Sequence, residues 1–394
     1  MLSEQAQKGP LLENISSGPS SLLWPSYAAA GLTTTPGRVL AGTAALCAFF
    51  ICFACPSAAQ QRQTSFQVTA AITCMAPDAK DQDDMCVWLH PHNPEKSTII
   101  TSDKKAGRLF VYDLSSKILQ SITLPKPGNV DTRRSFPLGG KEVDIVAVNQ
   151  RKGGYKIRVF AVDSSFRTLH AVDSGGIPTG KNYGGCLYHS CKTGNFYFIT
   201  TSKSGFLEQY RLFEKEKGGV SGRLVRSIPL GPCEGIVAHD ESGTLYVSEE
   251  EKGIWAFGAE PEDPAQGKLI AAVGKNGLTA DIEGLTICRT TGKGGYLIAS
   301  SQGSSTFCVY RLTEGYPFAG SFTVEGVQDT DGIDVLNTPL DTHFPHGLFA
   351  CHNGRDKTGC PVMLVPWEQV AGGIGIPFEG DTASSPSGSH TNQQ

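Results

Sequence analysis

Carboxylates recur along this chain at places where they could act together. Glu234-Gly235, Glu283-Gly284 and Asp331-Gly332 follow one another at intervals of about 50 residues, the period of large structural repeats. If such repeats surround an axis, their acids gather at one mouth and repel one another strongly. Oxygen donors without His or Cys pairs nearby suit a hard cation such as Ca²⁺. The residues that the openings of the repeats would gather are Asp83, Asp84, Tyr183, Glu234, Asp281, Glu283, Asp329, Asp331 and Asp334.

Basic side chains punctuate the same repeats. Lys104-Lys105, Arg151 and Lys203 each follow an expected strand and precede a glycine turn, so we expect them near one rim. Arg binds phosphate through paired hydrogen bonds and Lys acts as a point charge, so cations beside a carboxylate–metal cluster suit a polyphosphate. The simpler alternatives are that single lysines are solvated turn residues and that single acids cap turns.

Short β-strands are the elements that must position these residues. Runs such as 108–112, 156–162 and 196–200 are rich in β-branched and aromatic residues and are bounded by Gly, Asp or Asn. A unit of four strands that recurs about every 50 residues predicts the blades of a β-propeller, and a pair of β-sandwiches is the alternative. We predict an all-β, six-bladed β-propeller whose ring is closed by an N-terminal strand within Ser65–Thr73, with one short helix near Trp367–Ala371. The six expected openings are Asp84, Val143-Asp144, Tyr183-Gly184, Glu234-Gly235, Glu283-Gly284 and Asp331-Gly332.

By composition the chain divides into three parts. Residues 1–59 form a leader, in which Arg38 precedes an apolar run at 39–55 that is followed by Ser57-Ala58-Ala59. This pattern predicts a signal peptide that is cleaved before Gln60, and therefore a secreted protein; the alternative is membrane anchoring through 39–55. Residues 60–372 are expected to form the propeller domain, and the polar residues 373–394 a disordered tail.

Charge and cysteine usage narrow the classes of partner. The net charge of −4, from 34 basic and 38 acidic side chains, argues against nucleic-acid binding, which needs a basic surface. We expect a monomer without stable membrane contact once the leader is cleaved. Three of the 12 cysteines lie in the apolar run, and the others include no Cys-x-x-Cys pair, so a zinc site is not expected. In an oxidising compartment some cysteines should pair, and a disulfide between Cys351 and Cys360 could staple the turn between them.

Several longer motifs follow one another in order between about Ser65 and Ala371. The clearest are Asp83-Asp84-Met85-Cys86-Val87-Trp88, Asp281-Ile282-Glu283-Gly284-Leu285-Thr286, Ala299-Ser300-Ser301-Gln302-Gly303-Ser304-Ser305, Asp329-Thr330-Asp331-Gly332-Ile333-Asp334 and Val365-Pro366-Trp367-Glu368. Together they resemble the β-propeller phytases, the calcium-dependent alkaline 3-phytases. The resemblance covers nearly all of the chain beyond the leader.

The resemblance implies an activity and a set of site residues. Members of the family are six-bladed propellers that remove phosphate stepwise from phytate (myo-inositol hexakisphosphate) and need several Ca²⁺ ions, and other inositol polyphosphates are expected substrates. A metal-activated water is expected to attack phosphorus. The catalytic residues would then be Lys104, Arg151, Tyr183, Lys203, Glu234 and Glu283, and the substrate-binding residues Lys104, Lys105, Arg151, Tyr183 and Lys203. The metal ligands would be Asp83, Asp84, Glu234, Glu250, Asp281, Glu283, Asp329 and Asp334.

Three departures from the family pattern stand out. Met85-Cys86 replaces a usual Pro-Ala, Phe66–Met75 contains no acid, and His352-Asn353-Gly354 stands where an acidic or amide pair is usual. The last two put peripheral calcium sites in question and leave the central residues in place. Two other function classes stay open at this point, a calcium-dependent propeller lactonase or esterase and a non-catalytic propeller that binds a partner.

Overall fold

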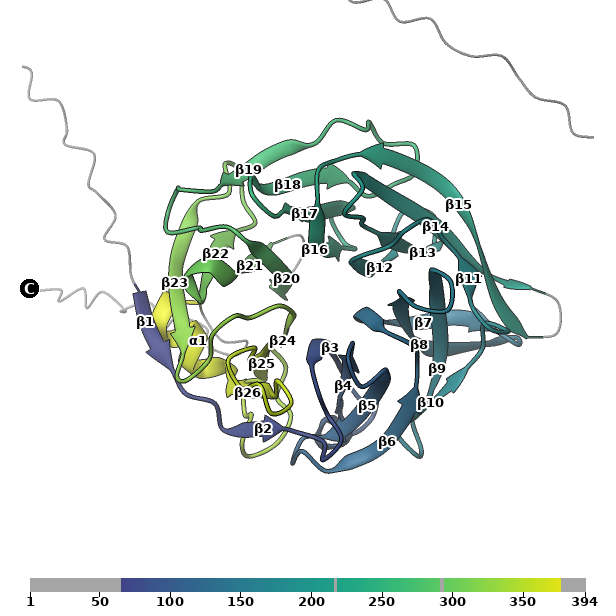
Figure 1. The fold of residues 1–394 in the computed structure, drawn as a ribbon, viewed down its shortest axis with the longest axis horizontal. Coiled ribbons are helices and arrows are strands. Elements are labelled where there is room, and N and C mark those ends of the chain that lie inside the picture. Colours follow the sequence, from purple (N-terminus) through teal and green to yellow (C-terminus); the bar gives the residue numbers. More distant parts are fainter. Residues whose placement is uncertain (1–64, 216–217, 291–293, 377–394) are drawn as a thin grey trace, which may run out of the picture. The chain divides into compact units, whose positions relative to one another are not determined.

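Six β-sheets surround a central axis in the computed structural model of the protein, as the repeats predict (Figure 1). The structure describes residues 65–215, 218–290 and 294–376. The leader with its apolar run 39–55, the cleavage point before Gln60 and the tail residues 377–394 lie outside the described residues. The six-bladed propeller is confirmed, and the alternative of two β-sandwiches is wrong.

Each of the first four blades is a single stretch of chain with its first strand at the axis. The first blade contains β3 (Gln82–Trp88), β4 (Thr98–Asp103), β5 (Arg108–Asp113) and β6 (Ile118–Thr123). The second contains β7 (Pro127–Leu138), β8 (Lys141–Gln150), β9 (Lys156–Asp163) and β10 (Thr168–Ala171), and β11 (Ile177–Pro178) also pairs with β9. The third contains β12 (Gly185–His189), β13 (Phe196–Thr200), β14 (Phe206–Lys215) and β15 (Gly219–Pro229). The fourth contains β16 (Cys233–His239), β17 (Thr244–Glu249), β18 (Gly253–Gly258) and β19 (Lys268–Ala272).

The last two blades borrow strands from the start of the described chain. The fifth contains β20 (Ile282–Arg289), β21 (Gly295–Ser301), β22 (Thr306–Arg311) and β23 (Phe318–Val324), to which β1 (Ser65–Val68) adds in parallel. The sixth contains β24 (Ile333–Leu336), β25 (Leu348–His352) and β26 (Val362–Pro366), to which β2 (Ile72–Cys74) adds antiparallel. The predicted closure of the ring is confirmed, since β2 completes the last blade.

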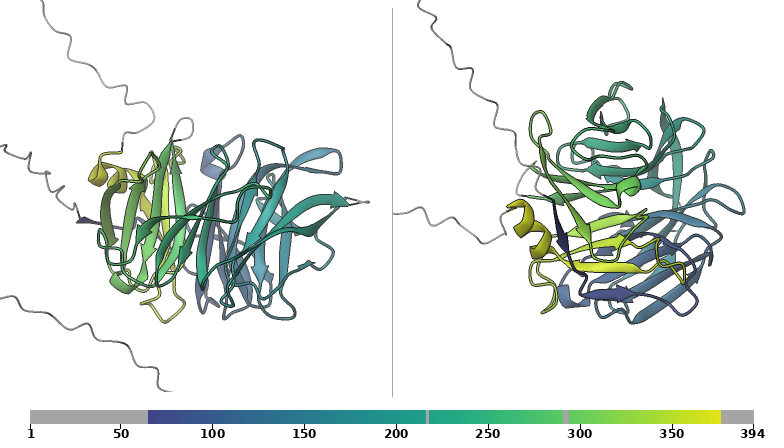
Figure 2. Two further views of the ribbon diagram at one scale, coloured as in Figure 1. Left: turned by 90° about the horizontal axis from the view of Figure 1, so that it is seen from above. Right: turned by 60° about the vertical axis from the view of Figure 1, so that its left-hand side comes forward.

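Helices are few among the described residues. The predicted short helix is α1 (Trp367–Ile374), and Figure 2 shows it beside β1 at the edge of the propeller. Its Gln369 side chain hydrogen-bonds the backbone of Thr69 in both directions, which ties the two ends of the propeller domain together. Two 3-10 turns, η1 (Pro94–Lys96) and η2 (Gln302–Ser304), complete the set. No helix in the described part of the chain is long and apolar enough to cross a membrane.

The opening of the second blade differs from the prediction. Val143-Asp144 belongs to β8, the second strand, where Val143 pairs with Phe136 of β7. The inner strand begins instead at Pro127-Gly128, which lacks the acid–glycine pair that marks other blades. The long β7–β8 hairpin therefore made the second strand of this blade look like its first.

Six apolar clusters hold the ring together, and each lies between two neighbouring blades. Between the fifth and sixth blades, for example, the rings of Phe307, Phe322 and Phe349 pack with centroids 5.0–5.2 Å apart. The packing holds blades at fixed positions round the axis, so residues at their inner ends are brought to defined places.

The expected disulfide between Cys351 and Cys360 is wrong, because both are free thiols. Cys351 lies in β25 within the apolar cluster between the fifth and sixth blades. Cys360 instead directs its thiol toward the Asp81 carboxylate. Cys351 is thus a small apolar core residue, the usual role of a buried cysteine without a disulfide.

Candidate active site

Glycines explain how the acids at the openings of the blades are held in place. A Cβ on Gly235 would lie 1.9 Å from the carbonyl oxygen of Glu283, the acid that opens the next blade. A Cβ on Gly284 would lie 2.5 Å from the carbonyl oxygen of Asp331. Gly184 likewise meets the backbone of Glu234. Each acid is therefore held against the glycine of the preceding blade, in a contact that no larger residue permits.

Three of the predicted carboxylates meet at the mouth of the propeller. Oxygen atoms of Glu234, Glu250 and Glu283 lie within 4.8 Å of one another. Burial raises the pKa of each, and the Glu234 carboxylate raises that of Glu283 further. Oε1 of Glu250 and Oε2 of Glu283 are buried without any hydrogen-bond partner. Clustered acids with unpartnered buried oxygens fit a hard cation such as Ca²⁺, which would neutralise them and take up the free oxygens.

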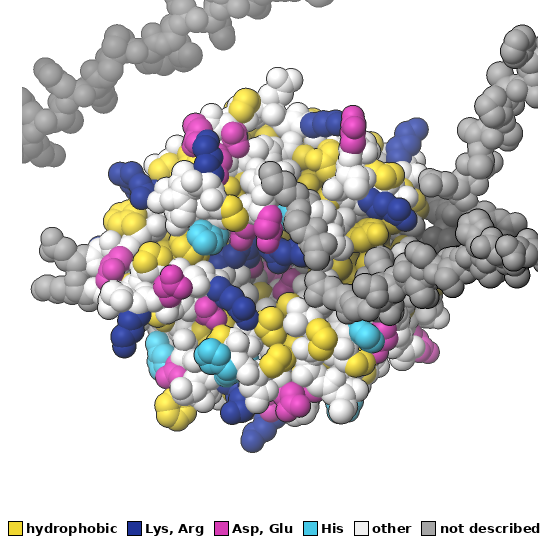
Figure 3. Space-filling model, turned by 180° about the vertical axis from the view of Figure 1, so that it is seen from behind, with side chains coloured by type: hydrophobic (Ala, Val, Ile, Leu, Met, Phe, Trp, Pro, Cys, Tyr) yellow, Lys and Arg dark blue, Asp and Glu magenta, His cyan; other side chains and the backbone are white. Residues whose placement is uncertain are grey.

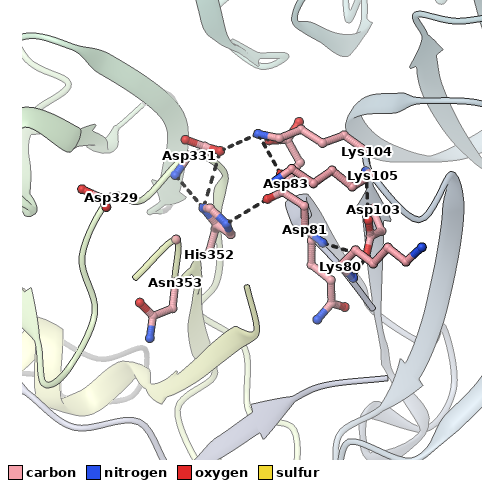
Figure 4. Close-up of polar contacts among 12 residues, drawn as sticks. Lys80, Asp81, Asp83, Asp103, Lys104, Lys105, Asp329, Asp331, His352 and Asn353 are labelled. Carbon is pink, nitrogen blue, oxygen red and sulfur yellow. Dashed lines mark hydrogen bonds and ion pairs between the residues drawn. The ribbon is translucent and has the colours of Figure 1, made fainter. Parts of the chain in front are cut away.

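Beside this cluster, Asp83 is held by two of the predicted cations. Arg151 contacts its Oδ2 at 2.8 Å, and Lys104 donates to its Oδ1 (Figure 4). Although burial alone would raise it, these two charges lower the pKa of Asp83. Lys104 also lies 3.1 Å from Asp331 Oδ2, and Arg151 lies 3.7 Å from Glu234 Oε1. The two cations therefore link carboxylates of the first, fourth and sixth blades.

Tyr183 stands between two cations at the same mouth. Lys203 Nζ lies 4.0 Å from the centre of its ring, and the Arg151 guanidinium lies 5.4 Å from it. The phenol hydrogen-bonds Glu234, and burial followed by the Glu234 charge raises the pKa of Tyr183. Tyr183 is therefore a neutral hydrogen-bond donor at neutral pH, oriented by the carboxylate cluster.

The side chains of Lys104, Arg151, Tyr183, Lys203 and Glu234 line an open cleft of about 560 Å³. Its lining residues are Lys104, Lys126, Arg151, Tyr155, Lys181, Asn182, Tyr183, Lys203, Ser204 and Glu234. Glu283, the remaining predicted catalytic residue, touches the cleft only through Glu234, which it contacts in the carboxylate cluster. Lys105 is a predicted substrate-binding residue that does not line the cleft, because its Nζ lies 2.9 Å from Asp81 Oδ2.

Two predicted metal ligands, Asp84 and Asp334, lie in the narrow channel along the axis. Asp84 accepts the backbone N–H of Val130 at 2.9 Å, and Asp334 accepts that of Val87 at 2.8 Å. Burial raises the pKa of Asp84 well above its usual range and that of Asp334 to about 6. In the structure both carboxylates join the inner strand of one blade to that of a neighbour, so their expected role as metal ligands stays a prediction.

Arg133 joins the second, third and fourth blades. Its guanidinium lies 2.9 Å from Asp131 and 2.8 Å from Asp240, and it also donates to the carbonyl of Leu187. Asp131 in turn accepts the backbone N–H of Leu187. The side chains of Arg133, Asp131 and Asp240 keep only 11%, 21% and 14% of their surface exposed, so the cation and the two carboxylates largely satisfy one another. The sequence offered no spacing that would have shown this pairing.

The two remaining predicted ligands lie at the edge of the carboxylate cluster or outside it. Asp281 is exposed and adds to the negative charge that raises the pKa of Glu250, after burial. Asp329 has a carboxylate that is 63% exposed and 3.9 Å from Lys357 Nζ, and Figure 4 shows it apart from the bonded group. Asp331, which was not among the expected metal ligands, is bonded to Lys104 and to Gln302 Nε2. The acid–glycine pattern at Asp331-Gly332 was the signal that could have ranked it first.

A second buried cluster contacts the backbone of Asp331. Ligand atoms of Asp81, His352 and Cys360 lie within 4.8 Å of one another. The backbone N–H of Asp331 donates to His352 Nδ1 at 3.0 Å, so the proton of the neutral imidazole sits on Nε2, 3.8 Å from Asp81 (Figure 4). Burial lowers the pKa of His352 to about 4, which keeps the ring neutral. A protonated Nε2 offers no lone pair to a metal, and it makes no hydrogen bond to Asp81. His352 therefore supports Asp331 through Nδ1, which accepts the backbone N–H of Asp331.

The chain is similar in sequence to known phytases. The model of a family described as Phytase matches residues 33–382. A curated 3-phytase of Bacillus subtilis (strain 168) is 40% identical over 310 residues, which make up 74% of this chain and 81% of that protein. A solved structure, described as BBS1N in complex with ARL6DN soaked with lead, is 10% identical with a TM-score of 0.43 and covers 72% of this chain and 78% of that one. That last likeness is too low to carry an argument.

Proposed function

Because the chain belongs to the phytase family, we propose that it hydrolyses phytate, releasing phosphate stepwise to leave lower inositol phosphates. The observation that carries the proposal is one cleft in which Lys104, Arg151, Tyr183 and Lys203 stand beside the clustered carboxylates. Cations select a substrate with several phosphates, and the carboxylates hold the metal that the family implies. A lactone or simple carboxylic ester carries no phosphate for these cations to bind.

We propose Ca²⁺ as that metal, with Glu234, Glu250 and Glu283 as its principal ligands and Asp83 and Asp331 beside them. The support is a donor set made only of carboxylate oxygens, two of which are buried and unpartnered. Bound Ca²⁺ would supply Lewis-acid polarisation of phosphate and of the attacking water. We also propose four further ligands, none of which belongs to this group of three: Asp84, Asp281, Asp329 and Asp334.

The residues of the chain itself orient the substrate and stabilise the charge that builds on phosphorus. Lys104 and Arg151 are fixed by Asp83, so they need little reorganisation when a phosphate oxygen approaches. Arg151 offers a planar guanidinium for two parallel hydrogen bonds, and Lys203 adds a mobile point charge. The Tyr183 hydroxyl donates a hydrogen bond to Glu234 in the free protein and can donate to a phosphate oxygen instead.

We further propose that the protein is secreted and acts as a monomer on a small-molecule substrate. Secretion rests on the apolar run 39–55 and the small residues before Gln60, which resemble a signal peptide. On the face shown in Figure 3, acidic and basic side chains are interspersed, and a nucleic-acid partner is not part of the proposal.

The test is phosphate release from phytate by the purified protein near neutral pH, first with Ca²⁺ and then with excess chelator. We expect release with Ca²⁺, loss with chelator and recovery when Ca²⁺ is returned. Absence of release from protein shown to be folded by circular dichroism would refute the proposal. A parallel assay with a lactone and a carboxylic ester would then show whether a propeller lactonase or a binding module is the better description.

A further inference from the structure

Short hydroxyl side chains hold neighbouring blades together at two seams of the ring. Ser248, in the second strand of the fourth blade, donates to the backbone carbonyl of Glu283 at 3.1 Å. Ser300, in the second strand of the fifth blade, donates to that of Thr330 at 2.8 Å. Because a hydroxyl oxygen lies only one bond beyond Cβ, the next blade must come close. At the first of these seams a Cβ on Gly235 would lie 1.9 Å from the Glu283 carbonyl oxygen.

The seam between the second and third blades is held by an amide instead (Figure 1). Asn149 is fully buried near the end of β8, beside Gly128 of β7. Its Nδ2 donates to the Tyr183 carbonyl at 2.7 Å and to Asn182 Oδ1 at 3.2 Å. The three atoms nearest to a Cβ on Gly128 all belong to Asn149, and the farthest of them is at 3.0 Å, so the Tyr183 carbonyl lies no closer. This seam is therefore wider than the one at Gly235, where the matching distance is 1.9 Å.

The wider seam lies at the candidate active site. Of the residues that line the cleft, Arg151 directly follows β8 and Tyr183 lies just before β12. Asn149 precedes Arg151 by two residues and binds the carbonyl of Tyr183, so it connects the two. The Arg151 guanidinium lies 5.4 Å from the centre of the Tyr183 ring. Asn149 itself is not among the lining residues, so it can act on a ligand only through its neighbours.

Folding alone does not explain an amide at this position. Asn149 Oδ1 is buried and has no hydrogen-bond partner among the residues that the structure describes. A buried oxygen without a partner lowers the stability of the folded state. A serine, as at Ser248, would join the two blades without adding this oxygen. The amide is therefore better explained by the spacing that it sets.

We infer that Asn149 is a positioning residue, which holds Tyr183 away from the second blade and so sets the width of the cleft between Arg151 and Tyr183. The inference rests on the proposed function and deepens it, because it names a residue outside the cleft that fixes the spacing of two phosphate-binding residues. With a shorter side chain at position 149, the Tyr183 carbonyl would approach Gly128, as happens at the narrower seams. Arg151 and Tyr183 would then no longer be aimed together at one phosphate.

The experiment compares Asn149→Ser with Gln209→Ser. Serine already holds a narrower seam at Ser248, so we expect Asn149→Ser to fold. Gln209 is a matched control, because it is fully buried, its Nε2 donates to the Ala259 carbonyl of the next blade at 2.8 Å, and its Oε1 has no partner in the described chain. Each variant removes one buried amide that joins two blades, but neither Gln209 nor Ala259 lines the cleft. The probe is myo-inositol hexakissulfate, a polyanion with no phosphate to release, titrated by calorimetry in the presence of Ca²⁺.

We expect both variants to lower the melting temperature by a few degrees. Only Asn149→Ser should raise the Kd of the probe, by about tenfold, which is the effect of losing one hydrogen bond to a charged group. The KM for phytate should rise with it, and the KM of Gln209→Ser should not. The inference is overturned if Asn149→Ser binds the probe as the unsubstituted protein does, or if Gln209→Ser raises the Kd equally. It is also overturned if the unsubstituted protein does not bind the probe.

A second substitution separates the spacing from the amide itself. Alone, Gly128→Ala should overpack the seam, because the added Cβ would lie 2.6 Å from Asn149 Oδ1. In the Asn149→Ser background the added methyl group fills the vacated space and keeps the Tyr183 carbonyl from approaching. We expect this double variant to melt above Gly128→Ala and to bind the probe within about twofold of the unsubstituted protein.

A double variant that binds no better than Asn149→Ser would show that spacing is not what Asn149 supplies. Because the probe measures binding without turnover, a protein that released no phosphate would refute the proposed function, and the Kd values would still decide the role of Asn149.

Discussion

Replacing Gly235 with alanine tests whether the contacts between blades position the active site. The added Cβ would lie 1.9 Å from the Glu283 carbonyl oxygen and 2.6 Å from Ser248 Oγ. A carbon–oxygen contact needs about 3.3 Å, so β16 and the start of β20 must part by about 1.4 Å. Overpacking of this kind costs about 1–3 kcal/mol of unfolding free energy. Because Glu234 precedes Gly235 directly, the shift falls on the carboxylate cluster, and a displacement near 1 Å can cost about 100-fold in rate.

The assay is the kcat/KM for phytate at saturating Ca²⁺, measured together with thermal unfolding. Gly372→Ala is the matched control, because Gly372 lies in α1 with nothing within 4 Å of the added Cβ, and alanine there should add about 0.5–1 kcal/mol of stability. A folded Gly235→Ala protein whose kcat/KM stays close to that of the control would refute the reasoning. It would mean that the mouth tolerates such a shift and that its acids are not held by the glycine contacts.

Three further predictions concern the buried charges. Glu283→Gln should abolish calcium-dependent phosphate release and the rise in melting temperature that Ca²⁺ causes. In chelator its melting temperature should be unchanged, because the raised pKa of Glu283 already keeps the carboxyl protonated without metal. Burial, followed by the charge of Asp83, raises the pKa of Asp331 to about 8. In chelator the contribution of Asp331 to folding stability is therefore full below about pH 4 and is lost as the pH rises through 8. The melting temperature should fall over this range, and Ca²⁺ should offset the fall more at high pH. A flat profile in chelator would contradict this assignment. Arg133→Met should lower the unfolding free energy by about 2–3 kcal/mol in a urea titration and should leave the KM for phytate unchanged. The expected loss is smaller than for a fully buried pair, because the Asp131 and Asp240 side chains are 21% and 14% exposed.

The repeat could be predicted from the sequence because its signature has a structural cause. A glycine follows the opening residue where one blade approaches the backbone of the next, as at Gly184, Gly235 and Gly284. The second blade escaped because its glycine, Gly128, meets the Asn149 side chain instead of a neighbouring acid. Without the acid–glycine pair, the strand that followed looked like an opening. Pattern reasoning therefore succeeded where the same contact recurs and failed where a different contact replaces it.

Within the site, the sequence could indicate residue types but not always their direction. Asp329 and Asp331 are two residues apart, and in an extended segment their side chains would share a face. The backbone of Asp329 adopts a left-handed conformation with φ of 51°, which breaks this alternation, and its carboxylate is exposed. The sequence analysis missed Lys126 and Lys181 as cleft residues for another reason. Exposed lysines before strands carry no periodic signal. Their place in the cleft depends on contacts between blades that no local pattern contains.

The way the ring closes sets an order of events during folding. Ile72 pairs with Leu364, and Ser65 pairs with Ser321. Strands from the start of the described chain can therefore pair only after strands near its end have formed. Contacts between such distant residues form slowly, because the chain between them must first be ordered. Until they form, β26 and β23 each present an unpaired edge that can join another chain. The state most prone to aggregation is therefore a nearly complete propeller in which β23 and β26 are still unpaired. Its lifetime is set by how fast residues 65–74 pair with these two strands.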